Sequence, residues 1–235
     1  MSALLEATPK KDKVKILKSL SETHHDCLYR FFPKKSEAEA LVSGKVWVST
    51  LEACRGYDDP ARGDAGEGTI EYNSGAISGN GSDPRLQMIA ARSGIGGIGP
   101  GVKNISISNV THSMRIPDAF VLCTTEKYAP DDMKDGIGSY CVKITDPNRF
   151  FKKVTRRLAE EYHLNLAKIN KVSYSKRHYT GTEPMFISHI GFVKPNIDIY
   201  TSQNEVRMLW ELKKHINIKP FLLDCPEIKK FCTLA

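Results

Sequence analysis

One arginine is the first residue whose type and position suggest chemistry. Arg30 lies in the aromatic run Leu-Tyr-Arg-Phe-Phe at residues 28–32, which is typical of a strand. Side chains alternate along a strand, so Arg30 points away from the face that carries Tyr29 and Phe31. Burying an unpaired guanidinium is costly, and we therefore expect an anionic partner. The partner is either a carboxylate of the same chain or a phosphate, which guanidinium groups bind through two parallel hydrogen bonds.

An amide and a carboxylate lie close together near the carboxyl end. Gln203 and Glu205 are two positions apart at the start of a predicted strand, so their side chains share one side of the chain. A carboxylate placed in this way could stabilise a developing oxocarbenium ion or bind a ribose hydroxyl, while the glutamine orients an acceptor. The simpler interpretation is an ion pair of Glu205 with Arg207 at the edge of a strand.

Two hydroxyl side chains, Ser49 and Thr50, end a second predicted strand at residues 45–50. Hydroxyls at the end of a strand either hold a ligand or cap the turn that follows. Taken alone, the pair does not separate these two possibilities.

Glycine is concentrated in one part of the chain. Twelve of the 17 glycines lie in residues 56–101, where large apolar side chains are few. This composition predicts either a long functional loop region or a partly disordered insertion. Residues 94–99 have the form Gly-x-Gly-x-x-Gly. The residues before them are not strand-like, however, and Pro100 blocks a following helix, so a dinucleotide-binding βαβ unit is not expected.

The elements that must position these residues are mostly strands. Strands are predicted at residues 28–32, 45–50, 105–111, 118–124, 139–144, 171–174, 187–193 and 205–213, and helices at 10–22, 37–42, 147–162 and 222–234. Strands outnumber helices and do not alternate regularly with them, which favours an α+β fold over a doubly wound sheet. With 235 residues and 40% hydrophobic residues, we expect a single domain that spans residues 1–235.

Composition narrows the class of protein. The net charge of +7 favours anionic partners, although a basic surface also simply improves solubility. No apolar run approaches the ~18 residues of a bilayer span, so we expect a cytoplasmic protein without a membrane segment. The six cysteines show no Cys-x-x-Cys spacing, and we expect free thiols and no metal site.

Basic residues follow one face of the helix predicted at 147–162 and continue into the next segment. They are Lys152, Lys153, Arg156, Arg157, Lys176 and Arg177. Near Lys176 and Arg177 the basic residues are interleaved with Tyr174 and Tyr179, a combination that suits nucleic acid because bases stack on the rings and cations meet the phosphates. The alternative is a solvated helix face followed by a loop.

The order of these motifs resembles that of a known family. An arginine on a first strand, hydroxyls that close a second and a late Gln-x-Glu resemble the R-S-E arrangement of mono-ADP-ribosyltransferases. The chain also resembles an uncharacterised bacterial family with Tyr-Arg, Trp-x-Ser, Asp-Pro and Glu-x-Arg motifs. The matching residues are Tyr29-Arg30, Ser43-Gly44, Val46-Trp47-Val48-Ser49, Asp58-Asp59-Pro60 and Glu205-Val206-Arg207. The resemblance covers residues 28–60 and 200–212.

The resemblance implies an ADP-ribosyltransferase-like split β-sandwich with flanking helices, in which two facing antiparallel sheets form a cleft for NAD. Arg30 would bind the pyrophosphate. Ser49 and Thr50 would brace the nicotinamide half of NAD, and Tyr57 would stack on the nicotinamide. We therefore expect these residues to converge with Glu205 in one cleft.

The implied reaction is the transfer of ADP-ribose from NAD to a macromolecular acceptor, a protein or a nucleic acid, with release of nicotinamide. Glu205 would act on the ribose and Gln203 would select the acceptor. Such an activity is typical of a toxin or effector. Two alternatives stay open: a non-catalytic nucleic-acid-binding or interaction protein, and an NAD glycohydrolase that uses water as the acceptor.

Overall fold

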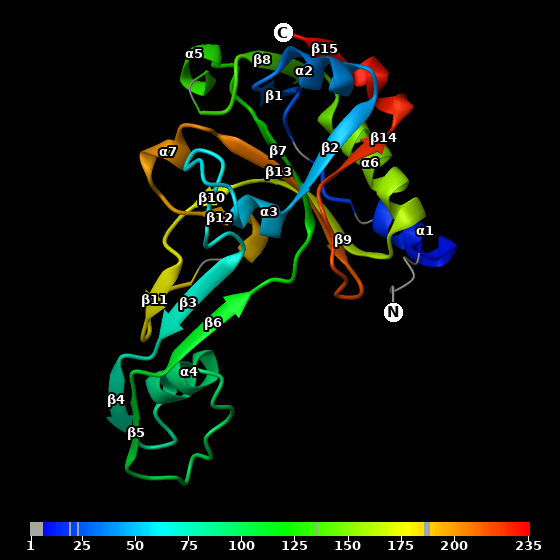
Figure 1. The fold of residues 1–235 in the computed structure, drawn as a ribbon. Coiled ribbons are helices and arrows are strands. Elements are labelled where there is room, and N and C mark those ends of the chain that lie inside the picture. Colours follow the sequence, from blue (N-terminus) through cyan, green and yellow to red (C-terminus); the bar gives the residue numbers. More distant parts are fainter. Residues whose placement is uncertain (1–6, 19, 23, 135, 186–188) are drawn as a thin grey trace. The chain divides into compact units, whose positions relative to one another are not determined.

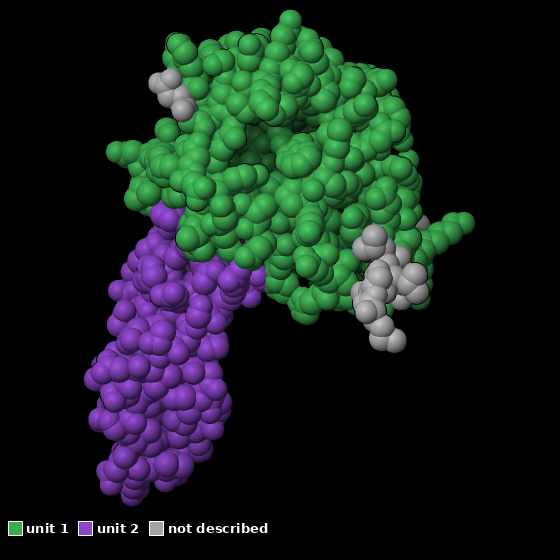
Figure 2. All heavy atoms as spheres, viewed as in Figure 1, with its two compact units in different colours: residues 1–67, 117–174, 196–235 green, residues 68–116, 175–195 purple. Residues whose placement is uncertain are grey.

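The chain forms two compact units. A computed structural model describes residues 7–18, 20–22, 24–134, 136–185 and 189–235. The larger unit comprises Met1–Glu67, Pro117–Tyr174 and Asn196–Ala235, and the smaller one comprises Gly68–Ile116 and Ser175–Pro195 (Figure 2). Within the predicted span of 1–235, the smaller unit is thus built from two separate segments, a division that composition alone does not reveal.

The larger unit contains an eight-stranded sheet, and every strand pair among its described residues is antiparallel (Figure 1). Its strands are β1 (Leu28–Phe32), β2 (Lys45–Thr50), β7 (Phe120–Thr125), β8 (Tyr140–Ile144), β9 (Leu164–Lys171), β13 (Glu205–Leu212), β14 (Phe221–Asp224) and β15 (Cys232–Leu234). The expected α+β class, with a mainly antiparallel sheet and flanking helices, is confirmed.

The sheet divides at β7. On one side β7 pairs with β13 along its whole length, and β9 follows β13. On the other side its first residues, Phe120 and Val121, pair with β2, whereas its last residue, Thr125, pairs with β1. The sheet therefore has a trunk of β9, β13 and β7 and two arms, one of β2 and β14 and the other of β1, β8 and β15.

Helices cover one face of this sheet. They include α1 (Lys10–Lys18), α2 (Lys35–Val42) and α6 (Pro147–Glu161), whose apolar residues enter the same core as the strands. Asp146 begins α6 by accepting a hydrogen bond from the Arg149 backbone N–H, and Pro147 occupies the first turn, where its missing N–H has no consequence. The fully buried Trp210 of β13 packs on Phe151 and donates from Nε1 to Thr155 Oγ1 at 2.8 Å.

Shorter elements connect these parts. They are α3 (Leu51–Arg55), α5 (Pro130–Met133), β10 (Ser173–Tyr174), α7 (Asp198–Thr201) and a 3-10 helix at Pro226–Phe231. Among the described residues, no helix is long and apolar enough to cross a bilayer.

The smaller unit corrects the expectation of one long loop at residues 56–101. It contains β3 (Thr69–Asn73), β4 (Ala76–Gly79), α4 (Pro84–Arg92), β5 (Ile105–Ser108), β6 (Thr111–Arg115), β11 (His178–Thr180), β12 (Val193–Lys194) and a 3-10 helix at Ile190–Phe192. Glycine is absent from α4, whose first turn is capped by Asp83 and whose Leu86 and Ile89 are buried. The high glycine content of the whole segment conceals these short elements.

Two other predicted elements are wrong. Residues 222–234 form β14, a 3-10 helix and β15 instead of one helix, because their strands pair with the free edges of both arms. Residues 187 and 188 of the strand predicted at 187–193 lie outside the described residues, and Ile190–Phe192 forms a 3-10 helix before the strand Val193–Lys194. Short apolar runs have no period that distinguishes a strand from a helix.

The hydrogen bond between Trp210 and Thr155 gives a test of this core. Thr155→Val keeps the shape of the side chain but leaves the buried indole N–H without an acceptor. We expect the free energy of unfolding, measured by urea denaturation, to fall by about 1–3 kcal/mol. The same change at the exposed Thr233 should have an effect within about 0.5 kcal/mol. Equal effects at both positions would contradict a contribution from this hydrogen bond.

Candidate functional site

The division of the sheet leaves a hollow in the larger unit. In Figure 2 its surface is hollowed over the region where Figure 1 draws β7 between β2 and α7. The strands that border this region carry the residues that the sequence singles out, namely Arg30 on β1, Ser49 on β2 and Glu205 on β13. The branch point of the sheet is therefore the candidate site.

Strand register places several of these side chains on one face of the sheet. Ser49 lies opposite Val121, Arg207 opposite Cys123, and Glu205 opposite Thr125. Residues that are directly opposite in an antiparallel pair point to the same side, and alternation along β7 joins the three pairs into one surface. We call this surface the site face. The other face of the trunk carries Leu122, Val206 and Met208 in the core.

Arg30 reaches the branch point from the other side of its strand. Tyr29 pairs with Thr125 of the site face. Arg30 is the next residue of β1, so its side chain leaves the strand on the opposite face. Its Nη2 nevertheless donates to the backbone carbonyl of Trp47 on β2, at 3.1 Å, and thereby spans the two arms. The guanidinium lies over the Phe32 ring, with its Cζ 5.3 Å from the ring centroid, and it interacts electrostatically with Cys123 and Tyr57.

Burial disfavours the charge of Arg30. Burial lowers its pKa to about 10, while Cys123, Tyr57 and Glu37 act in the opposite direction, and at pH 7 the group remains a cation. Its Nη1 is buried and has no hydrogen-bond acceptor within the described part of the chain. A buried donor without an acceptor is expensive, so this nitrogen is suited to receive an anion.

The two hydroxyls at the end of β2 have different surroundings. Thr50 is buried and accepts a hydrogen bond from the Ala53 N–H at 3.1 Å, which caps α3. Of the two possibilities that the sequence leaves open for Thr50, the structure shows the cap. Ser49 lies on the site face, with its Oγ 4.0 Å from the thiol of Cys54.

The loop after α3 carries Tyr57, whose side chain is 41% exposed. Gly63 allows the loop to close tightly, because a Cβ there would lie 2.0 Å from the Tyr57 carbonyl oxygen. Tyr200 donates to the Gly63 carbonyl at 2.8 Å, and Gln203 donates to the Ala61 carbonyl at 2.7 Å. Gln203 also donates to the carbonyl of Ile199, so its amide nitrogen forms hydrogen bonds with backbone carbonyls. These contacts of Gln203 hold the loop in position.

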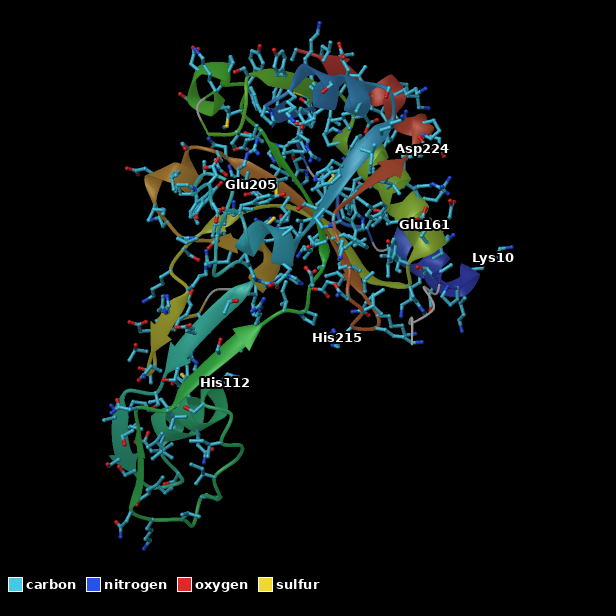
Figure 3. The ribbon with its side chains drawn as sticks, viewed as in Figure 1. Lys10, His112, Glu161, Glu205, His215 and Asp224 are labelled. Atoms are coloured by element: carbon cyan, nitrogen blue, oxygen red, sulfur yellow. The ribbon has the colours of Figure 1, made fainter. Side chains whose placement is uncertain are left out.

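A buried ion cluster lies beside this loop. Arg207 donates from Nη1 and Nη2 to the two carboxylate oxygens of Glu67, at 2.7 and 3.1 Å, and from Nε to Oε1 of Glu205, at 2.8 Å. The side chains of all three residues are at most 3% exposed. In Figure 3, Glu205 lies at the start of β13, next to α7. The simpler interpretation of the sequence, an ion pair of Glu205 with Arg207, is thus present, but it is buried rather than at a strand edge.

The two carboxylates stabilise the charge of Arg207. Burial acts to lower the pKa of Arg207, but Glu205 and Glu67 outweigh it and raise that pKa well above its ordinary value. Cys123 interacts electrostatically with both Arg207 and Arg30.

The predicted basic surface is divided between the two units. Lys152, Lys153, Arg156 and Arg157 lie on α6, where Lys152 and Arg156 are exposed and Arg157 pairs with Glu160 and Glu161. Lys176 and Arg177 belong to the smaller unit, where Lys176 pairs with Glu183 and Arg177 is buried. In the described ranges, no group of three or more His, Cys, Asp or Glu side chains is placed to hold a metal.

Sequence reasoning missed Glu67, Cys54 and Cys123. Glu67 lies among glycines without any periodic pattern, and its partner Arg207 is 140 positions away. Cys123 could have been found, because alternation along the apolar run at 118–124 separates it from Leu122.

Comparison with models of protein families, with curated proteins and with solved structures finds no match to this chain. The class that the structure itself defines is an α+β protein with a branched, antiparallel sheet and flanking helices.

The buried ion cluster gives a test of the site's structure. Arg207→Met removes the cation and leaves two carboxylates without it. We expect the free energy of unfolding at pH 7 to fall by about 3–5 kcal/mol, because uncompensated buried charge is strongly destabilising. Urea denaturation measures the loss, and a fall of less than about 1 kcal/mol, the value of an exposed ion pair, would contradict the cluster.

Proposed function

We propose that this protein is an ADP-ribosyltransferase-like enzyme that uses NAD as a co-substrate, with the branched sheet as a split β-sandwich. The observation that carries the proposal is the buried Nη1 of Arg30, which lacks an acceptor among the described residues at the point where β1 and β2 separate. A guanidinium in this position fits the pyrophosphate of a dinucleotide, since planar guanidinium donors match phosphate oxygens.

The carboxylate of Glu205 supplies the second requirement of the reaction. When the bond between nicotinamide and ribose breaks, its electron pair neutralises the pyridinium ring and positive charge develops on the ribose. The carboxylate of Glu205 is buried and held by Arg207, and such a preorganised charge stabilises a cation more than mobile water does. The acceptor's nucleophile then bonds to the anomeric carbon and loses its proton.

Other residues of the site would bind and orient NAD. Tyr57, half-exposed on a tightly held loop, offers a ring on which nicotinamide can stack. Ser49 offers a hydroxyl on the site face. Thr50 and Gln203 would contribute indirectly, because Thr50 fixes the turn after β2 and Gln203 fixes the loop that carries Tyr57.

The acceptor in this proposal is a macromolecule, a protein or a nucleic acid. The exposed Lys152 and Arg156 are four positions apart on α6 and form a small basic surface of the larger unit. This surface favours the second candidate function, nucleic-acid binding without catalysis. That candidate predicts affinity that falls steeply with salt and falls further when both residues are changed.

Removing the charge of Glu205 tests the enzyme directly. We expect Glu205→Gln to retain NAD binding and an unchanged melting temperature, because glutamine still accepts from Arg207 and leaves a neutral Arg207–Glu67 pair. The rate of nicotinamide release should fall about 10²–10³-fold. The matched control is Glu211→Gln, at the other end of the same strand, which should keep the full rate.

Arg30→Ala should act at a different step. It should abolish NAD binding, measured by calorimetry, whereas Arg30→Lys should bind more weakly because the ammonium cannot form the paired hydrogen bonds. Full activity of Glu205→Gln would overturn the catalytic assignment. A wild-type protein that neither binds NAD nor releases nicotinamide would overturn the proposed function as a whole.

A further inference from the structure

Two large apolar side chains lie exposed on the arm formed by β2 and β14, which are neighbouring strands at one edge of the sheet (Figure 1). Trp47 of β2 and Leu222 of β14 are directly opposite each other and are 46% and 49% exposed. Residues directly opposite in an antiparallel pair point to the same side, so the two side chains form one apolar surface. We call it the Trp47–Leu222 surface. A single exposed apolar side chain is common in proteins, whereas adjacent ones at the border of a site are available to a ligand.

The Trp47–Leu222 surface continues the site face. Ser49 belongs to the site face, and Trp47 is two positions away on the same strand, so both side chains leave β2 on the same side. Two residues of a strand span roughly 6.6 Å, which puts the indole next to the site. Val46 and Leu223, which alternate with the exposed pair, are buried in the core on the opposite face.

Arg30 lies at the border between the two surfaces. Its Nη2 donates to the Trp47 carbonyl at 3.1 Å, at the point where β2 separates from the trunk of the sheet. The pairing of β2 with β7 covers the last two residues of β2, and Trp47 comes before them. From β13, which carries Glu205, the sheet continues through β7 to β2 and then to β14. Glu205 and the Trp47–Leu222 surface thus lie on opposite sides of β7, and Arg30 reaches the gap beside Trp47.

We propose that the Trp47–Leu222 surface binds the adenine ring of NAD, which stacks on the indole of Trp47 and packs against Leu222. This inference rests on the proposed function, in which the pyrophosphate binds Arg30 and the nicotinamide half extends towards Glu205. The pyrophosphate is the middle of NAD, so the adenosine half extends to the other side, over the arm. An exposed aromatic ring next to a phosphate-binding cation suits a purine, because every base has a π face that stacks on such a ring.

Binding of two smaller ligands tests this inference without the reaction. ADP carries the adenine and the pyrophosphate, and inorganic pyrophosphate lacks the base. In calorimetric titrations, Trp47→Ala should weaken ADP binding about 10-fold, because one base–aromatic stack is lost. Its affinity for inorganic pyrophosphate should stay within about twofold, because the guanidinium contact is unchanged. The matched control is Tyr140→Ala, which removes a 42% exposed ring from β8 of the other arm and should change neither affinity.

Fluorescence gives an independent measurement. The chain has two tryptophans, and Trp210 is fully buried in the core, so quenching of the emission by ADP reports on Trp47. We expect ADP to quench the wild-type protein. Trp47→Phe keeps a smaller ring, so it should bind ADP better than Trp47→Ala does while its emission, from Trp210 alone, is unaffected by ADP.

The nicotinamide-release assay separates this inference from the function on which it rests. Trp47→Ala should raise KM for NAD about 10-fold and leave kcat within about twofold, because the stack is present before and during the reaction. An unchanged KM for NAD together with unchanged ADP binding would overturn the inference while the transferase proposal stands. So would a variant that loses only transfer to the macromolecular acceptor, because Trp47 would then contact the acceptor instead. Equal losses in Trp47→Ala and Tyr140→Ala would also overturn it.

Two outcomes concern the wild-type protein. ADP binding that depends on Trp47, without any release of nicotinamide from NAD, would support the adenine site and overturn the transferase. A wild-type protein that binds neither ADP nor NAD would overturn both.

Discussion

The buried guanidinium of Arg207 is the constraint on which the rest of the larger unit depends. A fully buried cation must be compensated, and here Glu205 and Glu67 compensate it from positions 2 and 140 residues away. The pairing ties β13 to the end of the loop that carries Tyr57. The pairing also requires this end of the loop to lie against the sheet. The Arg207 side chain is buried away from water, so Glu67 must come within hydrogen-bond distance of it.

The branch of the sheet follows from a second constraint, which is that both β7 and β13 are buried. Both strands contribute large apolar side chains to the core, and their pairing is continuous. β7 is too short to pair with β1 and β2 over their full lengths, so each arm takes one end of it. The backbone groups between the arms then need other partners, and the Trp47 carbonyl receives one from Arg30.

The sequence predicts those parts of this arrangement whose signal is local. The strand around Arg30, the strand that begins near Glu205 and the helix that begins at residue 147 each depend on neighbouring residues, and the structure has all three. Glu67 and the branch of β7 depend on pairings between distant segments, which leave no period or motif in the chain. The short elements of the smaller unit are concealed by glycines that serve the turns between them, such as Gly75 with its positive φ.

Arg30 also allows a purely structural interpretation, in which it only bridges the two arms. A bridge to one carbonyl uses a single donor, Nη2, and an uncharged side chain such as glutamine would make the same contact without the cost of burying a charge. The retained charge, its pKa lowered to about 10 by burial, and the buried Nη1 without an acceptor among the described residues are all unfavourable. An anion between the arms relieves each of them at once.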